Sequence, residues 1–231
     1  MQHAVPALAL LGLLTLSACG QPAATAPTPA VPPVDPAPAK LPGATVKLQL
    51  TEASDPIGWT LGAANIELYQ YVKGFGSDGP LIAKAQSNAA GSATLNLPGE
   101  DGGVLKLATL PLASLPGQLF DSCASTVQSS DPAAKGLMGN QYFFSTSDGG
   151  GRAEAGYSKP LTLSFTDTML VFSTRASTLT GTLVCDGTSS PINLTVDAGW
   201  NIVDAKYNVL NQGVGFNKVP LSTTLTVVRK K

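Results

Sequence analysis

The sequence of 231 residues contains a single histidine, His3, so no histidine follows residue 3. The rest of the chain cannot build a histidine-based catalytic triad, a histidine-ligated zinc site or an imidazole general base. The G-x-S-x-G, S-x-x-K and phosphate-loop motifs are also missing, as is any D-x-D-x-D-G calcium loop. We therefore predict no metal and no cofactor, and we expect a protein that is not an enzyme.

Charged residues are scarce, at 13% of the chain, with 14 basic and 15 acidic side chains. They are spread evenly, and no basic patch or stripe occurs. A protein that binds nucleic acid needs such a patch to contact phosphates. We therefore predict no nucleic-acid partner.

Long apolar runs are missing too. Residues 7–16 form an apolar segment of about ten residues, whereas a membrane-spanning helix needs roughly 20. The segment ends in Leu16-Ser17-Ala18-Cys19, an aliphatic residue and two small residues before a cysteine. This stretch resembles the lipobox of bacterial lipoproteins, in which the cysteine thiol receives a diacylglyceryl group before cleavage.

The resemblance implies a signal peptide at residues 1–18 and a lipidated Cys19, carrying palmitate-type chains, as the first residue of the mature protein. It also implies a location in the bacterial cell envelope, outside the cytoplasm and in the outer membrane if the cell has one. Residues 1–6 contain no Lys or Arg, although export signals usually carry one or two. An ordinary secretory signal with an incidental cysteine is the alternative.

Residues 19–43 are rich in proline and alanine. Such a sequence cannot bury a core and favours extended polyproline-like states, so we predict a disordered tether. From residue 44 onward, short runs alternate between apolar and polar residues, which is the pattern of half-buried strands. Predicted strands cover 46–50, 66–72, 81–86, 93–97, 104–107, 119–123, 140–145, 161–166, 169–174, 179–185, 192–196, 199–210 and 221–228.

This pattern predicts a mainly β protein, an antiparallel β-sandwich built as two small domains or one extended domain. The expected boundaries are a first β domain at 44–110, an irregular connection at 111–139 and a second β domain at 140–231. Residues 62–68 and 87–98 resemble the carboxypeptidase-regulatory or transthyretin-like modules of bacterial envelope proteins. They share Gly-Ala before a strand, and a Gly-centred turn before a strand that ends in Leu-Pro. The resemblance implies a small β-sandwich with a structural or binding role and no catalytic residues.

Two cysteines remain in the body, Cys123 and Cys185. An even pair in an exported protein favours a disulfide, which would pin the irregular connection to the C-terminal strands. Two buried free thiols are the alternative.

The remaining motifs give weaker indications of function. The run of residues 74–79 matches G-x-G-x-x-G, but Pro80 and a strand follow it, so we interpret it as a hairpin loop rather than a dinucleotide site. Trp59 follows a predicted loop, and we expect it to be exposed and available as a ligand contact, since its ring could stack on a sugar. Trp200 lies between two strand patterns, where core packing is expected.

Together these observations predict a membrane-anchored envelope lipoprotein with a non-catalytic structural or binding role. Its partners would be membrane lipid, through acylated Cys19, and a cell-wall glycan or another envelope protein. One alternative is a glycan- or cell-wall-binding module that uses Trp59 or the tyrosines. A second alternative is an envelope hydrolase that uses two carboxylates. The acidic residues mostly lie beside glycine or in turns, which favours turn formation instead.

Overall fold

Strands hold 63% and helices 7% of the residues that the computed structural model describes, which confirms the mainly β prediction. The described residues are 39–52, 58–71, 79–119, 123–159, 164–208, 210 and 213–229. They belong to one compact unit, Ala39–Lys231. The predicted signal peptide, Cys19 and nearly all of the predicted tether lie outside the described residues.

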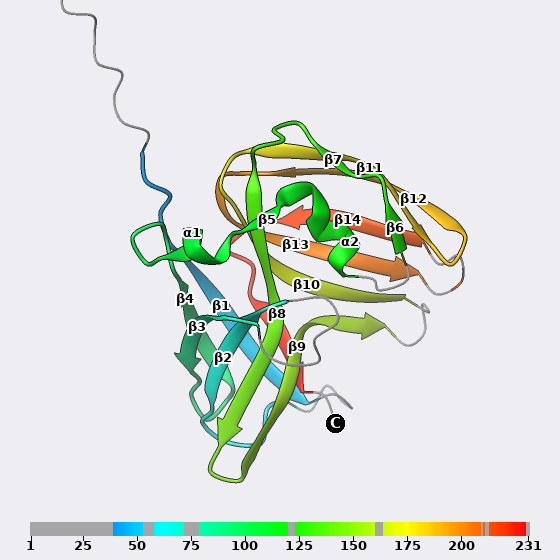
Figure 1. Ribbon diagram of the computed structural model, residues 1–231. Coiled ribbons are helices and arrows are strands. Elements are labelled where there is room, and N and C mark those ends of the chain that lie inside the picture. Colours follow the sequence, from blue (N-terminus) through cyan, green and yellow to red (C-terminus); the bar gives the residue numbers. More distant parts are fainter. Residues whose placement is uncertain are drawn as a thin grey trace, which may run out of the picture. The chain divides into compact units, whose positions relative to one another are not determined.

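The larger sheet contains eleven of the described strands (Figure 1). They are β1 (Ala44–Glu52), β2 (Asn65–Gln70), β3 (Leu81–Gln86), β4 (Ser92–Leu97), β5 (Leu110–Pro111), β8 (Lys135–Thr146), β9 (Gly149–Lys159), β10 (Ser164–Ser173), β13 (Gly199–Asn208), β14 (Gly213–Val219) and β15 (Leu225–Arg229). The smaller sheet contains β6 (Cys123–Ser125), β7 (Gln128–Ser129), β11 (Ser177–Cys185) and β12 (Thr188–Val196). The short helices are α1 (Val104–Leu107), η1 (Leu112–Ser114) and α2 (Leu115–Gln118).

The main path of the larger sheet runs β14-β13-β10-β8-β9-β15-β1-β4, and β2 joins it by pairing with β8 and β3. Pairings between the described strands are antiparallel except that of β15 with β1, which is parallel. Strands from the two predicted domains therefore share one sheet, because β2 pairs with β8 and β1 pairs with β15. The predicted connection at 111–139 contributes β5 and the beginning of β8 to the same sheet.

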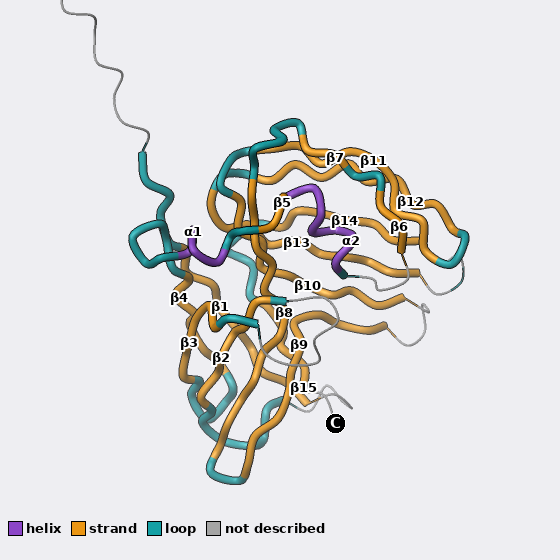
Figure 2. Tube along the Cα trace, in the orientation of Figure 1, coloured by secondary structure: helices purple, strands orange, loops and turns teal. Residues whose placement is uncertain are grey.

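The strands β8, β10 and β13 form a central layer (Figures 1 and 2). Apolar side chains of this layer pack into a core cluster on each of its faces. In β10, Leu170 and Phe172 belong to a first core cluster, which is shared with β1, β2, β4 and β15. The alternate residues Met169 and Val171 belong to a second cluster, shared with β11 and β12 of the smaller sheet. The larger sheet thus folds back on itself around the first cluster, and the smaller sheet packs against the other side of its central layer.

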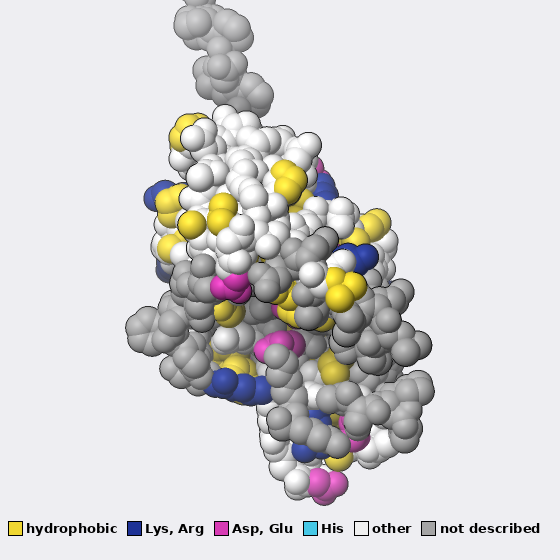
Figure 3. Space-filling model, turned by 90° about the vertical axis from the view of Figure 1, so that its right-hand side faces the viewer, with side chains coloured by type: hydrophobic (Ala, Val, Ile, Leu, Met, Phe, Trp, Pro, Cys, Tyr) yellow, Lys and Arg dark blue, Asp and Glu magenta, His cyan; other side chains and the backbone are white. Residues whose placement is uncertain are grey.

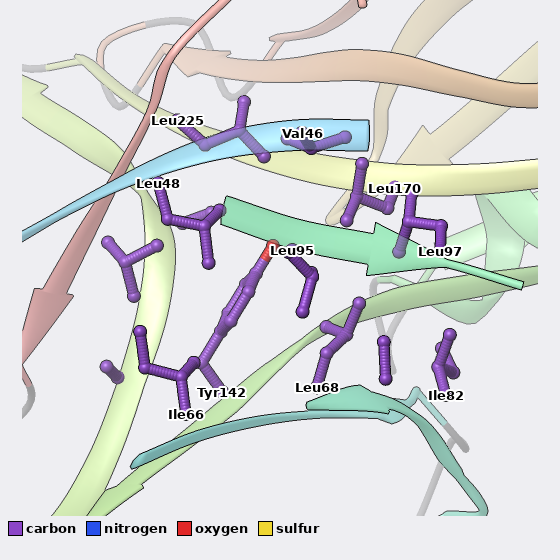
Figure 4. Packing of buried hydrophobic residues seen from close by; sticks show 14 of the residues in the cluster. Val46, Leu48, Ile66, Leu68, Ile82, Leu95, Leu97, Tyr142, Leu170 and Leu225 are labelled. Atoms are coloured by element: carbon purple, nitrogen blue, oxygen red, sulfur yellow. The ribbon is translucent and has the colours of Figure 1, made fainter. Parts of the chain in front are cut away.

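Tyr142 of β8 crosses the first cluster, where its ring packs beside Leu95 and Leu48 (Figure 4). The residue is 1% exposed, and its hydroxyl has no hydrogen-bond partner in the described structure. Burial raises the pKa of the phenol, so the group stays neutral at any physiological pH.

Most predicted strands overlap an observed one, and the prediction at 81–86 coincides with β3. The prediction of a strand at 104–107 is wrong, because these residues form the single turn α1. Gly103, with φ of 84°, turns the chain before Val104, and the N–H of Ala108 donates to the carbonyl of Val104. Three apolar residues and Lys106 in a run of four fit one helical turn as well as a strand, so the short pattern does not distinguish the two.

Two further differences concern strand limits. The predicted strands 161–166 and 169–174 meet in one continuous strand, β10, which pairs with β13 over its whole length. The strands β9 and β14 were not predicted, because β9 begins with Gly149-Gly150-Gly151 and β14 contains Gly213 and Gly215. Glycine usually marks a break in a strand pattern, so pairing with neighbours decides these segments rather than local preference.

The predicted disulfide between Cys123 and Cys185 is confirmed. These residues are partners in the register of β6 and β11, with their Cα atoms 4.3 Å apart. The bond closes a loop with a sequence separation of 62 residues. It ties β6, a strand of only three residues, to the nine-residue strand β11.

Reduction of this disulfide should lower the free energy of unfolding by about 2–4 kcal/mol, because the unfolded chain regains the entropy of an open loop. Denaturant unfolding with and without reductant measures the loss, and mass spectrometry of non-reduced peptides checks the bond. Amide exchange should rise first in β6, since its few backbone bonds depend on β11. Two alkylatable thiols in protein isolated without reductant would contradict the bond.

Candidate functional site

Two of the sequence motifs lie wholly or mostly outside the described residues. Cys19, the predicted site of lipidation, is one of them. The glycine-rich run at 74–79 is the other, since residues 72–78 are not described. The structure therefore leaves both as predictions.

The expectation that Trp59 is an exposed ligand contact is wrong. The residue is 6% exposed and belongs to the first core cluster. Its ring stands edge-on to Phe144, at 5.2 Å between centroids, and its indole N–H donates to the carbonyl of Gly62. Gly91 makes room for it, because a Cβ atom there would lie 2.6 Å from the Cβ of Trp59. A tryptophan in a short connection can thus fold back into the core, which its neighbours in sequence do not reveal.

Trp200 is buried, as expected from its place between strand patterns. Its indole N–H donates to the carbonyl of Pro98 at 2.8 Å, and its ring stands edge-on to Phe172. Both tryptophans are therefore packed in the core.

A partly exposed surface with aromatic side chains lies on the outward side of four neighbouring strands, β3, β2, β8 and β9. We call it the β2–β8 face, and strand register arranges its side chains in three transverse rows. The first row holds Gln86, Asn65, Ser145 and Gly150. The second holds Lys84, Glu67, Phe143 and Arg152. The third holds Leu81, Tyr69, Gln141 and Glu154.

The second row carries a network of polar contacts. Lys84 Nζ lies 2.5 Å from Glu67 Oε1, and the hydroxyl of Tyr69 donates to Glu67 Oε2 at 2.7 Å. The hydrogen bond from Lys84, followed by that from Tyr69, holds the pKa of Glu67 below its usual range. Glu67 therefore stays ionised, and both of its oxygens are fixed in direction.

Two aromatic rings stand beside this network. The rings of Tyr69 and Phe143 meet edge to face, with centroids 5.2 Å apart and an interplanar angle of 81°. The guanidinium carbon of Arg152 lies 5.3 Å from the centroid of Phe143. Such contacts contribute about 0.5–1.5 kcal/mol each at partly exposed positions. They fix the orientation of Phe143 on a surface where it is only half-buried.

A hollow of about 400 Å³ lies between the first and second rows. Asn65 and Ser145, which have short side chains, line one side of the hollow, which we call its low side. Glu67, Lys84 and Phe143, which have longer side chains, line the opposite side, which we call its high side. The hollow lies between these residues because those of the first row have shorter side chains than those of the second row. Its volume falls within the range of small-molecule sites in proteins.

A second polar hollow, of about 610 Å³, lies on the outward side of β1 and β4. Its lining includes Lys47, Gln49, Ser92 and Thr94, and it has no aromatic side chain. Ser92 already donates to Gln49 Oε1 at 2.7 Å, so these groups satisfy one another. The hollow of the β2–β8 face is therefore lined by both ionised and aromatic side chains, whereas the hollow on β1 and β4 is lined by no aromatic side chain.

Charged side chains do not gather by sign elsewhere on the visible surface. Figure 3 shows one face of the molecule, on which the described Lys and Arg side chains and the Asp and Glu side chains form small separate groups. This distribution agrees with the even spread of charge along the sequence. On this face the described charges form no extended patch of one sign that would attract a polyanion or a polycation.

The described residues include no group of three His, Cys, Asp or Glu side chains that could hold a metal ion. The pKa of Asp131 is lowered, first by a hydrogen bond from the backbone of Ala133 and then by Arg175. The pKa of Glu67 is lowered as well, whereas a general acid needs a raised pKa.

Comparison of the chain with protein-family models, with curated proteins and with solved structures found no match. In the described part of the chain, no helix is long and apolar enough to cross a membrane.

Sequence reasoning did not single out Glu67 or Phe143, and it considered Tyr69 only as one of the tyrosines of a glycan-binding module, although a signal for all three exists. In residues 66–71 the polar and aromatic side chains alternate with Ile66 and Leu68. In residues 140–145, Phe143 lies on the face opposite Tyr142. An aromatic residue on the polar face of a strand is the feature that identifies this surface.

Replacing Lys84 by Met should raise the pKa of Glu67 toward its ordinary value, because the largest cause of its lowering is removed. Because the pKa of Glu67 is lower in the folded than in the unfolded chain, the ion pair stabilises the fold at pH values above the ordinary glutamate pKa. This stabilisation is lost as the pH falls through the lowered pKa of the folded state. Carbon-detected NMR titration of the Glu67 carboxyl measures the shift. Lys47→Met, on the outward side of β1, is the matched control and should leave Glu67 unchanged. An identical Glu67 titration in wild type and Lys84→Met would contradict the network.

Proposed function

We propose that this chain is a lipid-anchored protein of the bacterial cell envelope that works by binding a ligand rather than by catalysis. The observation that carries this proposal is the β2–β8 face. There, a carboxylate with both oxygens already hydrogen-bonded stands beside an aromatic pair and a hollow of about 400 Å³. Rigid polar groups next to an apolar surface are the usual composition of a binding site.

The anchor is proposed from Leu16-Ser17-Ala18-Cys19, and the tether from the proline-rich residues that follow. The first strand, β1, begins at Ala44, directly after the predicted tether. The N–H of Leu41 donates to Glu100 Oε2 at 3.1 Å, and Lys40 Nζ lies 2.6 Å from Asp101. These contacts hold the chain where it enters the folded unit, so the tether would present the unit from a fixed point.

The hydrolase alternative has less support. Glycosidases need one carboxyl group with a raised pKa and a second at about 5–10 Å across a cleft. The carboxyl with ion-pair and hydroxyl partners in the hollow, Glu67, has a lowered pKa. A permanently ionised group of this kind accepts hydrogen bonds but does not deliver protons.

Cys19→Ser tests the anchor. In bacteria fed a labelled fatty acid, the wild-type protein should be labelled and sediment with membranes, because two or more acyl chains make dissociation negligible. The Cys19→Ser protein should be unlabelled, and either unprocessed or soluble. Membrane retention of this variant, together with no label on wild type, would overturn the anchor.

Photo-crosslinking in intact cells tests the binding role. A photoreactive amino acid at position 65 or 145 stands at the hollow, whereas one at position 96 stands on the outward side of β4 as the control. A defined adduct should form from 65 and 145 and be absent from 96. No adduct at any position, or the same adduct at all three, would overturn a binding function of this face.

A further inference from the structure

We propose that the hollow of the β2–β8 face binds an uncharged saccharide of one or two rings. This inference rests on the binding function proposed above and names its ligand. It depends on which groups the hollow offers, on its charge balance and on its size.

The backbone beneath the hollow is already paired. β2 lies between β3 and β8, and β8 lies between β2 and β9 over this region. An extended peptide that adds to a sheet needs free backbone N–H and C=O groups at an edge. Neither β2 nor β8, which form the floor of the hollow, offers such groups, and the one edge at its rim is that of β3, which pairs only with β2 among the described strands. Recognition within the hollow therefore depends on side chains, as it does for the hydroxyl groups of a sugar.

The low side of the hollow presents Asn65 and Ser145, which are paired across β2 and β8. The amide and the hydroxyl each donate and accept hydrogen bonds. Sugar hydroxyls also do both, so either orientation of an O–H group finds a partner here. Both residues are exposed and lie outside the core.

The high side presents a fixed acceptor and an apolar surface. Glu67 is held by Lys84 and by Tyr69, and each carboxylate oxygen retains capacity for another donor. Phe143 supplies carbon surface against which the C–H groups of a sugar ring can pack. Because these side chains are already oriented, binding loses little side-chain entropy.

The charges of the face balance, which points to an uncharged ligand. Lys84 and Arg152 are cationic, while Glu67 and Glu154 are anionic, all on β3, β2 or β9 of the same face. Lys84 is engaged by Glu67 at 2.5 Å. A phosphate or a carboxylate ligand would have to compete with that carboxylate, whereas a hydroxyl group can join the existing network.

The dimensions agree with a small saccharide. Alternate residues along a strand are spaced by about 6.6–6.8 Å, which is the distance between the first and second rows. A hollow of about 400 Å³ between these rows accommodates one or two sugar rings.

The test is an array of uncharged mono- to tetrasaccharides of glucose, galactose, mannose and N-acetylglucosamine, with sialylated and sulfated saccharides and random peptides for comparison. The full chain, as isolated from the expressing cells, should bind at least one uncharged saccharide. Titration of that saccharide, followed by saturation-transfer NMR, should give an affinity that changes less than about twofold between 0.05 and 0.5 M salt.

Four variants locate the binding. Glu67→Gln and Phe143→Leu should each weaken it by about tenfold or more, since each removes one interaction of the ligand. Ser145→Gln should weaken it by filling the hollow from an exposed position, and it decides the matter if Phe143→Leu unfolds. Asn96→Ala, on the outward side of β4, is the control and should change the affinity by less than about twofold.

Several outcomes would overturn the inference. One is that no saccharide binds, in which case a crosslinked protein at positions 65 and 145 would leave the binding function standing with a different ligand. Another is binding of acidic saccharides alone, with affinity that falls steeply with salt. A third is equal weakening by Asn96→Ala and Glu67→Gln, which would place the saccharide on another surface.

Discussion

The burial of β8, β10 and β13 on both faces is the constraint on which this structure depends. In β10 the run Met169-Leu170-Val171-Phe172 sends alternate side chains into two different cores. Side chains of a strand alternate between faces, so a continuous apolar run can only be satisfied with a core on each side. Full burial of each such side chain contributes about 1.5–3 kcal/mol. One layer therefore stabilises both core clusters.

The central layer also determines where the candidate site lies. The first part of β8, including Leu137 and Met138, is buried on both faces, whereas from residue 141 onward burial alternates. Gly139 stands at this change, where a Cβ atom would lie 2.7 Å from Ile82 Cδ1. Beyond it β8 leaves the central layer, and one face becomes free of a covering sheet. Phe143 is partly exposed because its strand has passed from a region covered on both faces to one covered on a single face.

One edge strand of each sheet, β14 and β12, is joined to the other by a hydrogen bond. β14 ends the path of the larger sheet, and β12 ends that of the smaller one. The backbone N–H of Val214 donates to the buried hydroxyl of Ser190 at 2.9 Å, which joins these edges through a side chain. An unpaired edge is a site for association with other chains. The bond satisfies one backbone N–H of the β14 edge and ties that edge to β12.

Local alternation in the sequence predicted most of the strands, because period-two burial is visible in a few residues. The disulfide was predicted from a different signal, namely that only two cysteines remain in the body of a chain expected to be exported. Local alternation did not predict that β15 inserts between β1 and β9, since that pairing joins the two ends of the folded unit and leaves no local signal. The burial of Trp59 escaped for a similar reason, because Gly91, which makes room for it, lies 32 residues away along the chain.

The candidate site was only partly predictable, because it is a product of register. No local pattern in the sequence indicates that the three residues that form its centre, Lys84, Glu67 and Phe143, are neighbours. They lie side by side only because the register of β3, β2 and β8 aligns them. The register shifts on both sides of β2 occur at Tyr69, beyond this row, so the alignment at Glu67 is regular. Pairing across three strands cannot be read from any one of them.

The register that forms the site is itself enforced by the core. A slip of β2 by one residue would turn Ile66 and Leu68 outward and bury Glu67. Burial of an ionised carboxylate away from its partners costs several kcal/mol, in addition to the lost apolar contacts. The same two apolar residues that pack into the first cluster thus hold Glu67 beside Lys84 on the outward face. The positions of the polar groups in the hollow are therefore determined by Ile66 and Leu68, which lie in the core on the opposite face of β2. A ligand in the hollow would not contact these two side chains.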